Sequence, residues 1–192
     1  MKIVGIVPSI NHSRNECNIK LDVNLINFLS RIFKKSDFQI LSKKKINKYD
    51  LIVLSGGNTI KKISRKREDL IRNSLDNYYL NYSIKNKIPI IGICHGAQFL
   101  ASSFESEINK KKGHVRKYHT IFLNSKKTVK VNSFHNYSIT KLSNNFIKLA
   151  WTKDGSMEAF KHKKYKMLGI MWHPERNSKI KKFDLDFIKK FL

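Results

Sequence analysis

The chain has 192 residues, 41% of them hydrophobic, and its formal net charge at pH 7 is +25. This length is enough for a buried core, and we expect a single domain over residues 1–192. The lysines are spread along the whole chain without an interleaved nucleic-acid-binding signature, so we interpret the charge mainly as a solvated surface and expect no nucleic-acid partner. Such a charge can also attract a small anionic substrate.

The cysteines and the apolar segments favour a reducing compartment. Cys17 and Cys94 are the two cysteines, which is too few for a disulfide framework. The N-terminal apolar segment is interrupted at Pro8 and is too short for a signal peptide, and no apolar run approaches the length of a transmembrane helix. We therefore expect a cytoplasmic protein with no membrane partner.

Hydrophobic periodicity in the first half predicts alternating strands and helices, as in an α/β protein. The expected elements are a strand at 2–7, a polar loop at 8–18, a helix at 23–33, strands at 38–41 and 50–54, and a crossover helix within 60–87. The last of these strands runs into Ser55-Gly56-Gly57-Asn58. Adjacent glycines let the backbone approach a ligand closely and can present a bare N–H group to an oxyanion, although they are also common in simple turns.

The segment 88–100 is the centre of the predicted chemistry. An apolar strand ends at Gly92-Ile93-Cys94-His95-Gly96, and a helical pattern follows. Cys94 therefore lies where a strand turns sharply into a helix, between two glycines, which is the arrangement of a nucleophile elbow. The N-terminus of the helix favours a thiolate. Considered alone, the segment is equally compatible with a small buried cysteine at a tight turn.

The second half supplies a base and a group to orient it. We expect an exposed charged segment at 105–116, strands at 118–123, 128–131, 146–151 and 167–172, and an amphipathic helix at 183–192. His173 and Glu175 follow the late apolar strand, with Pro174 between them. A cysteine hydrolase needs a base for the thiol proton and a third group to hold that base. A histidine at a strand end without any role is the alternative for His173 alone.

Four motifs together resemble a known family. Cys94-His95-Gly96-Ala97-Gln98 resembles the nucleophile motif of class I glutamine amidotransferases, and Trp172-His173-Pro174-Glu175 resembles their His/Glu motif. The segments 131–135 and 154–159 are similar to the gamma-glutamyl hydrolase, or peptidase C26-like, branch. The resemblance extends from the first strand to Glu175. It implies a flavodoxin-like three-layer α/β/α sandwich with a mostly parallel central sheet.

The resemblance also implies roles for individual residues. Cys94 would be the nucleophile that forms a thioester, His173 the acid and base, and Glu175 its orienter. The backbone N–H groups of Gly57 and His95 would form the oxyanion hole. The substrate-binding positions would be Gln98, Ser133, Phe134, His135 and Asn58.

Some positions depart from the pattern of the family or receive no role. His95, Ala97, Asn58 and Asn136 differ from the residues common there, and we expect them to line the mouth of the site. His114, His119 and Cys17 are given no role. The histidines are scattered and the cysteines lie far apart, so the spacing indicates no metal site, and no cofactor is expected.

The reaction implied by the resemblance is the hydrolysis of a γ-glutamyl amide, with release of glutamate. The expected substrate is an anionic nucleotide conjugate, γ-glutamyl-CDP-amidate, which would give cytidine diphosphoramidate for capsule modification, with Arg14 or Arg116 as candidate phosphate contacts. One alternative is a glutaminase subunit that delivers ammonia to a partner synthase, and another is a hydrolase of a different γ-glutamyl amine. From another class, a basic binding domain on an inactive amidotransferase fold remains an alternative. The oligomeric state does not follow from the sequence.

Overall fold

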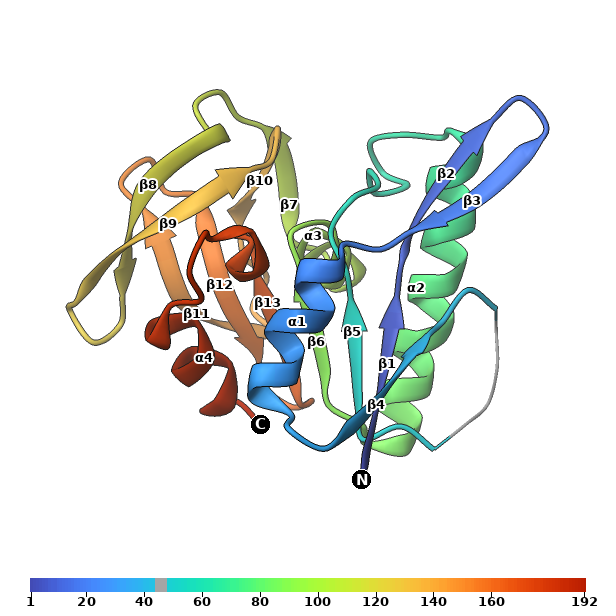
Figure 1. Ribbon diagram of the computed structural model, residues 1–192. Coiled ribbons are helices and arrows are strands. Elements are labelled where there is room, and N and C mark those ends of the chain that lie inside the picture. Colours follow the sequence, from blue (N-terminus) through green and yellow to red (C-terminus); the bar gives the residue numbers. More distant parts are fainter. Residues whose placement is uncertain (44–47) are drawn as a thin grey trace.

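The computed structural model describes residues 1–43 and 48–192 as strands and helices around one large sheet (Figure 1). The strands are β1 (Lys2–Val7), β2 (Ser9–Ser13), β3 (Glu16–Lys20), β4 (Ser36–Ile40), β5 (Leu51–Leu54), β6 (Ile90–Ile93), β7 (Glu107–Lys110), β8 (Val115–Leu123), β9 (Thr128–Phe134), β10 (Tyr137–Lys141), β11 (Phe146–Thr152), β12 (Met157–His162) and β13 (Met167–Ile170). The helices are α1 (Val23–Ile32), α2 (Arg67–Asn86), α3 (His95–Ser103), the short 3-10 helix η1 (Pro174–Arg176) and α4 (Lys182–Lys189).

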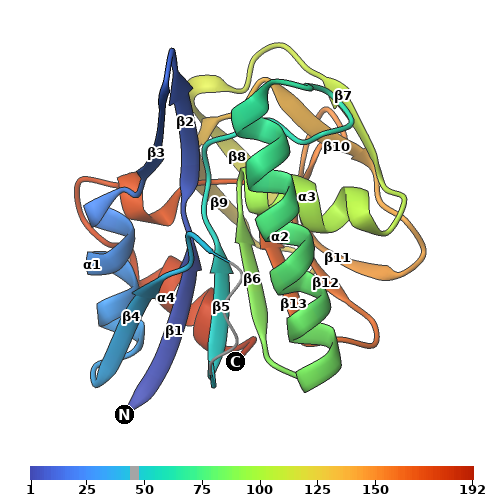
Figure 2. The ribbon, with the colours of Figure 1, turned by 90° about the vertical axis from the view of Figure 1, so that its right-hand side faces the viewer.

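The central part of the sheet is parallel, in the order β4-β1-β5-β6-β13. Its strands are short apolar runs because both faces are covered. Helices α1 and α4 cover one face, and α2 and α3 cover the other (Figures 1 and 2). The buried side chains form two clusters, one on each face, to which Phe28 of α1 and Tyr79 of α2 contribute. The α/β/α sandwich predicted from the sequence is confirmed.

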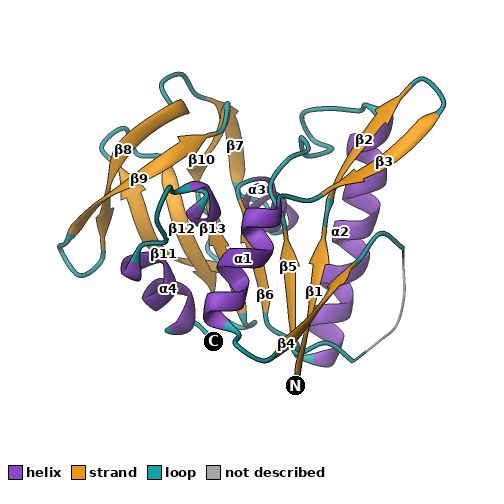
Figure 3. Ribbon diagram, in the orientation of Figure 1, coloured by secondary structure: helices purple, strands orange, loops and turns teal. Residues whose placement is uncertain are grey.

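The remaining strands extend the sheet in antiparallel fashion, through β12, β11, β8 and β9, with β10 and β7 attached at one side. Figure 3 shows how much of this half is strand. The sequence predicted only parts of β8, β9 and β11 here and placed β7 inside an exposed charged segment. Strand β7 is indeed mostly exposed and carries no apolar alternation, so periodicity could not reveal it.

Residues 8–18 are not the polar loop that the sequence predicted. They form most of a β-hairpin in which β2 pairs with β3, with Ser9 opposite Lys20 and Ser13 opposite Glu16. Every residue of β3 is exposed, so no hydrophobic pattern marks this strand. The hairpin does rise from the carboxyl end of β1, as expected. None of the helices in the described ranges is both long and apolar enough to cross a membrane.

Candidate active site

Three loops meet at the carboxyl edge of the parallel strands. Strands β5, β6 and β13 are neighbours in the sheet, with Leu54 opposite Gly92 and Gly92 opposite Gly169. The loops that leave these strands carry Gly56, Cys94 and His173, which are far apart in the sequence. Parallel α/β sheets place ligands at this edge.

Cys94 has the backbone of a nucleophile elbow. It lies between β6 and α3 with φ 51° and ψ −101°, a conformation that residues other than glycine rarely adopt. A Cβ atom on Gly92 would overlap the backbone of Gly96, and a Cβ atom on Gly96 would overlap the carbonyl oxygen of Leu54. Both glycines are therefore required by close backbone approach, and the elbow predicted from the sequence is confirmed.

His173 and Glu175 form a tight buried pair behind Cys94. The Nδ1 atom of His173 lies 2.6 Å from Oε1 of Glu175, and both side chains are buried. This contact fixes Nδ1 as the nitrogen that faces the carboxylate and leaves Nε2 for Cys94. The carboxylate is thus placed to hold one tautomer and to stabilise the imidazolium.

The electrostatics favour a thiolate–imidazolium pair. Burial opposes ionisation of Cys94, but the charge of His173 and a hydrogen bond from it outweigh that cost, so the pKa of the thiol is lowered. Burial also opposes protonation of His173, but the charge of Cys94, its hydrogen bond and Glu175 together raise the pKa of His173 to about 9. Cys94 can therefore be a nucleophile at neutral pH.

Asn132 holds the backbone of His173 and was not among the predicted site residues. The N–H group of His173 donates to Oδ1 of Asn132 at 2.8 Å, and Nδ2 of Asn132 donates to the carbonyl oxygen of His173 at 2.7 Å. The ring of the neighbouring Phe134 meets the imidazole edge to face, with centroids 5.7 Å apart. The sequence did contain one signal for this role, because Asn132 is a polar residue within the segment 131–135 that is similar to the family.

The loop after β5 approaches the catalytic residues closely. A Cβ atom on Gly56 would lie 2.6 Å from Cε1 of His173, and Gly57 has φ +133° and packs against Ser9. His95 is the first residue of α3, so its N–H group has no partner within the helix. The two backbone donors predicted for an oxyanion hole thus belong to segments that flank Cys94.

The side chain of His95 does not line the mouth of the site, and that prediction was wrong. It is 1% exposed, with Nδ1 2.6 Å from the carbonyl oxygen of Asn58 and Nε2 2.9 Å from Oδ2 of Asp76. Asp76 also binds Arg72, whose guanidinium donates to the carbonyl oxygen of Ser55. This buried network anchors the loop after β5. Ala97 is also fully buried in the core, contrary to the prediction.

The polar groups of the expected substrate-binding positions largely contact the protein itself. Nε2 of Gln98 donates to the carbonyl oxygen of Tyr137, and the Ser133 hydroxyl donates to that of His114. Nδ1 of His135 lies 3.0 Å from the carbonyl oxygen of Tyr137. The amide of Asn58 binds the backbone of Ile10, which ties the β2–β3 hairpin to the loop after β5. Phe134 is half-buried beside His173, and Asn136 is exposed.

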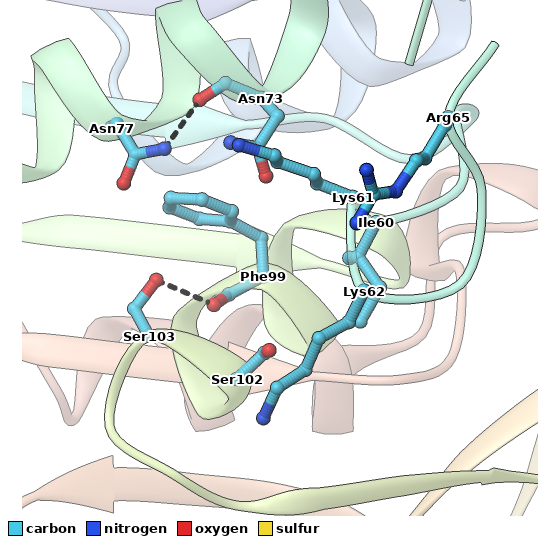
Figure 4. A pocket seen from close by; sticks show the side chains of 9 residues that line it. All are labelled: Ile60, Lys61, Lys62, Arg65, Asn73, Asn77, Phe99, Ser102 and Ser103. Atoms are coloured by element: carbon cyan, nitrogen blue, oxygen red, sulfur yellow. Dashed lines mark hydrogen bonds between the residues drawn. The ribbon is translucent and has the colours of Figure 1, made fainter. Parts of the chain in front are cut away.

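Two cavities lie near α3 and near the loop after β5. One, of about 380 Å³, is lined by Lys61, Lys62 and Arg65 and by the C-terminal half of α3 (Figure 4), and Cys94 is not among its lining residues. The other, of about 410 Å³, has Gly57 in its wall together with Lys20 and Lys66 and the acidic residues Glu68 and Asp69. Arg14 and Arg116, the predicted phosphate contacts, are exposed and line neither cavity.

Removing the charge of Glu175 should change the pH dependence of Cys94. In Glu175→Gln the imidazolium of His173 loses its carboxylate, so the pKa of His173 should fall and that of Cys94 should rise. The thiolate exists above the pKa of Cys94, so less of it remains at pH 7, and we expect inactivation by iodoacetamide to slow about tenfold there. The acidic limb of the rate–pH profile should move to higher pH. Glu107→Gln, at an exposed carboxylate on β7, should match wild type; an unchanged profile in Glu175→Gln would contradict the pairing.

This fold and this elbow define a class of protein. The family model described as glutamine amidotransferase class-I matches residues 9–192, and the chain belongs to this family. Over 127 residues it is 39% identical to a gamma-glutamyl-CDP-amidate hydrolase of Campylobacter jejuni, covering 66% of this chain and 62% of that protein. Over 132 residues it is 30% identical to a glutamine-hydrolyzing GMP synthase subunit of Methanococcus aeolicus, covering 65% and 63%.

Solved structures agree on the fold. The chain superimposes on a glutamine amidotransferase from Thermotoga maritima with a TM-score of 0.70 and 18% identity, covering 98% of this chain and 83% of that one. The sequence matches to the two curated relatives, by contrast, span somewhat less than two thirds of the length of each relative.

Proposed function

We propose that the chain hydrolyses a γ-glutamyl amide through a thioester on Cys94. The observation that carries this proposal is the buried contact of 2.6 Å between Nδ1 of His173 and Glu175, beside a cysteine at a strained elbow. A structural cysteine at a tight turn has no need of a base, nor of a carboxylate that orients the base. The complete triad also argues against a purely binding role for this basic chain.

The reaction runs in two halves. The thiolate of Cys94 attacks the γ-carbonyl carbon, and the resulting oxyanion accepts hydrogen bonds from the backbone N–H groups of Gly57 and His95. The C–N bond breaks as Nε2 of the His173 imidazolium gives its proton to the leaving nitrogen, which yields the thioester. His173, now neutral, takes a proton from water, and the hydroxide equivalent displaces Cys94. Glutamate leaves, and the thiolate–imidazolium pair is restored without a cofactor.

The substrate that we propose is γ-glutamyl-CDP-amidate, with cytidine diphosphoramidate as the second product. Two observations support it: the 39% identity to the Campylobacter jejuni hydrolase and the net charge of +25. The cavity beside Gly57 has Lys20 and Lys66 in its wall as candidate pyrophosphate contacts, together with the carboxylates of Glu68 and Asp69. A place in the peptidase C26-like branch, a role in capsule biogenesis and a cytoplasmic location belong to the same proposal.

The glutamyl end would be held on the opposite side of Cys94. We assign this role to Gln98 and to the segment Ser133-Phe134-His135, which lies beside His173. Because the Ser133 hydroxyl is already bound to His114, its contact with the substrate would come from the main chain. The amide of Asn58 is bound to the backbone of Ile10, so the role that we assign to Asn58 is indirect: it fixes the position of the loop after β5.

A substrate panel tests the proposal. The purified chain is incubated with γ-glutamyl-CDP-amidate, L-glutamine or γ-glutamyl-p-nitroanilide, and released glutamate is measured, with Cys94→Ala as the blank. We expect kcat/KM for the nucleotide conjugate to exceed that for glutamine by about 10²-fold or more, since contacts to a leaving group can lower the barrier by several kcal/mol. Raising the ionic strength should increase KM for the conjugate and leave that for glutamine unchanged.

A glutaminase subunit is the second candidate, and the relatives named as glutamine-hydrolyzing GMP synthase subunits favour it. It predicts little hydrolysis of either compound by the isolated chain and activity on glutamine only with a partner synthase. Failure of all three compounds in the panel would therefore favour this function. Faster turnover of glutamine than of the conjugate would overturn the nucleotide proposal and leave the thioester chemistry intact.

A further inference from the structure

A buried carboxylate outside the triad is surrounded by histidines. Glu158 of β12 is 0% exposed. Within 4 Å of its oxygens, all the ion-pair partners among the described residues are histidines: His114, His119 and His135. Despite the charge of +25, no lysine or arginine of the described ranges pairs with it. Burial of an ionised carboxylate is costly unless a positive charge compensates it.

The contacts are too long to be hydrogen bonds of ordinary strength. Nδ1 of His114 lies 3.7 Å from Glu158, Nε2 of His119 lies 3.4 Å away, and Nε2 of His135 lies 3.5 Å away. All three nitrogens and both carboxylate oxygens are buried and lack a hydrogen-bond partner. Five such atoms facing one another are exceptional, because buried polar groups are nearly always satisfied.

The separations between the Glu158 carboxylate and the nitrogens of His114 and His119, 3.7 and 3.4 Å, are close to those of donors around a metal ion. Two donors on a tetrahedral zinc ion lie about 3.3 Å apart when each bond is about 2.0–2.1 Å long. The donor atoms of His114, His119 and Glu158 all lie within 4.8 Å of one another. His135 also turns Nε2 toward the carboxylate, at 3.5 Å, but it is not part of this close group of donors. Imidazole and carboxylate together suit zinc and its neighbours in the first transition series.

An outer contact orients the His114 ring in the way that metal-binding histidines are usually oriented. Nε2 of His114 lies 3.0 Å from Oδ2 of Asp154, which leaves Nδ1 to face Glu158. Such a partner on the far nitrogen fixes the tautomer and raises the basicity of the ligand. Asp154 is itself held by Thr152 and by the N–H group of Ser156.

We propose that His114, His119 and Glu158 form a site for one divalent transition metal ion, zinc being the best fit, with a water molecule in the fourth position. The ion joins the turn before β8, β8 itself and β12, which are separate segments of the antiparallel half. The carbonyl oxygen of His114 accepts the Ser133 hydroxyl, and Asn132 of the same strand holds the backbone of His173. The site is therefore structural, and it supports the strand that positions His173.

The first test is metal content. The full chain, without a histidine tag, is expressed, dialysed against metal-free buffer and analysed by mass spectrometry of the elements. About one zinc per chain is expected. After removal of the metal with a strong chelator, Co²⁺ should restore a saturable visible absorption typical of a four-coordinate site, and Zn²⁺ should raise Tm by mass action.

Variants separate this site from surface binding. Glu158→Gln and His119→Ala should each reduce bound zinc to less than about 0.2 per chain, since each removes one of the three protein donors. His119 is at the rim of the cluster, so its variant keeps the test usable if Glu158→Gln does not fold. His12→Ala, in the β2–β3 hairpin, is the matched control and should keep the wild-type content.

The outcomes are distinct. A wild-type chain that holds no zinc as isolated and shows no cobalt absorption on reconstitution would overturn the site, leaving a metal-free cluster of histidines around Glu158. The same holds if Glu158→Gln and His119→Ala keep as much metal as wild type. Neither measurement depends on catalytic turnover, so the metal site and the proposed reaction are tested independently of each other.

Discussion

Replacement of Cys94 by alanine is expected to reduce kcat for the γ-glutamyl substrate by about 10⁴-fold or more, because the residues of such a triad act as a unit. The variant should still bind the substrate, since the loop after β5 and Phe134 are unaffected. Glutamate release measures the first effect, and calorimetric titration with the substrate measures the second. Cys94→Ser should be almost as inactive, because the elbow is arranged to stabilise a thiolate and a serine hydroxyl ionises far less readily.

The other thiol provides the control for this prediction. Cys17 lies on the exposed strand β3 of the hairpin and is free, as is Cys94. Cys17→Ala should keep wild-type turnover. In wild type, one equivalent of iodoacetamide should be consumed with loss of activity, and mass spectrometry should place the label on Cys94 at neutral pH. Full turnover by Cys94→Ala would refute the proposed chemistry.

The second large effect is expected from a single methyl group. In Gly56→Ala, the new Cβ atom would lie 2.6 Å from Cε1 of His173, closer than packed carbon atoms approach. Either the imidazole or the loop after β5 must move, which displaces the base from Cys94 or Gly57 from the oxyanion. A displacement of about 1 Å in a catalytic group can cost about 10²-fold in rate, and we expect a loss of this size in kcat.

A double-mutant cycle shows whether this loss acts through His173. In a His173→Ala background the methyl group has room, so Gly56→Ala should cause little further loss. Additive losses would indicate that Gly56→Ala acts elsewhere, for example by moving the oxyanion donor. Thermal unfolding of each variant, followed by circular dichroism, separates these effects from a loss of folded protein.

The parts of the molecule that could be predicted from sequence are those with a strong local pattern. The buried strands β1, β5, β6 and β13 are short, mainly apolar runs. Three of them are followed by a residue of a type that is typical of a catalytic site: Gly56, Cys94 and His173. The elbow at Cys94 follows from two glycines that flank a cysteine between a strand and a helix. Glu175 as the partner of His173, and an N–H donor at the paired glycines, were inferred from the residues themselves, whereas the substrate-binding positions came from the resemblance to a family. All of these roles remain predictions about chemistry.

Other features depended on contacts that no local pattern records. His95 follows the nucleophile in the sequence and therefore seemed to line the site, but the first turn of α3 directs its ring toward Asp76 on α2. His114, His119 and Glu158 have no metal-binding spacing along the chain, because β8, the turn before it and β12 bring them together. Strands β3 and β7 lack apolar alternation, since almost all of their residues are exposed.

The buried contact between His95 and Asp76 has a consequence for how this family can vary. The main-chain N–H group at position 95 belongs to the active-site loop, whereas its side chain belongs to the interior. A homologue with an apolar residue there would leave the carboxylate of Asp76 paired with Arg72 alone. Positions 95 and 76 should therefore change together over evolutionary time, and selection for new substrates should act on the hairpin and the cavity beside Gly57 instead.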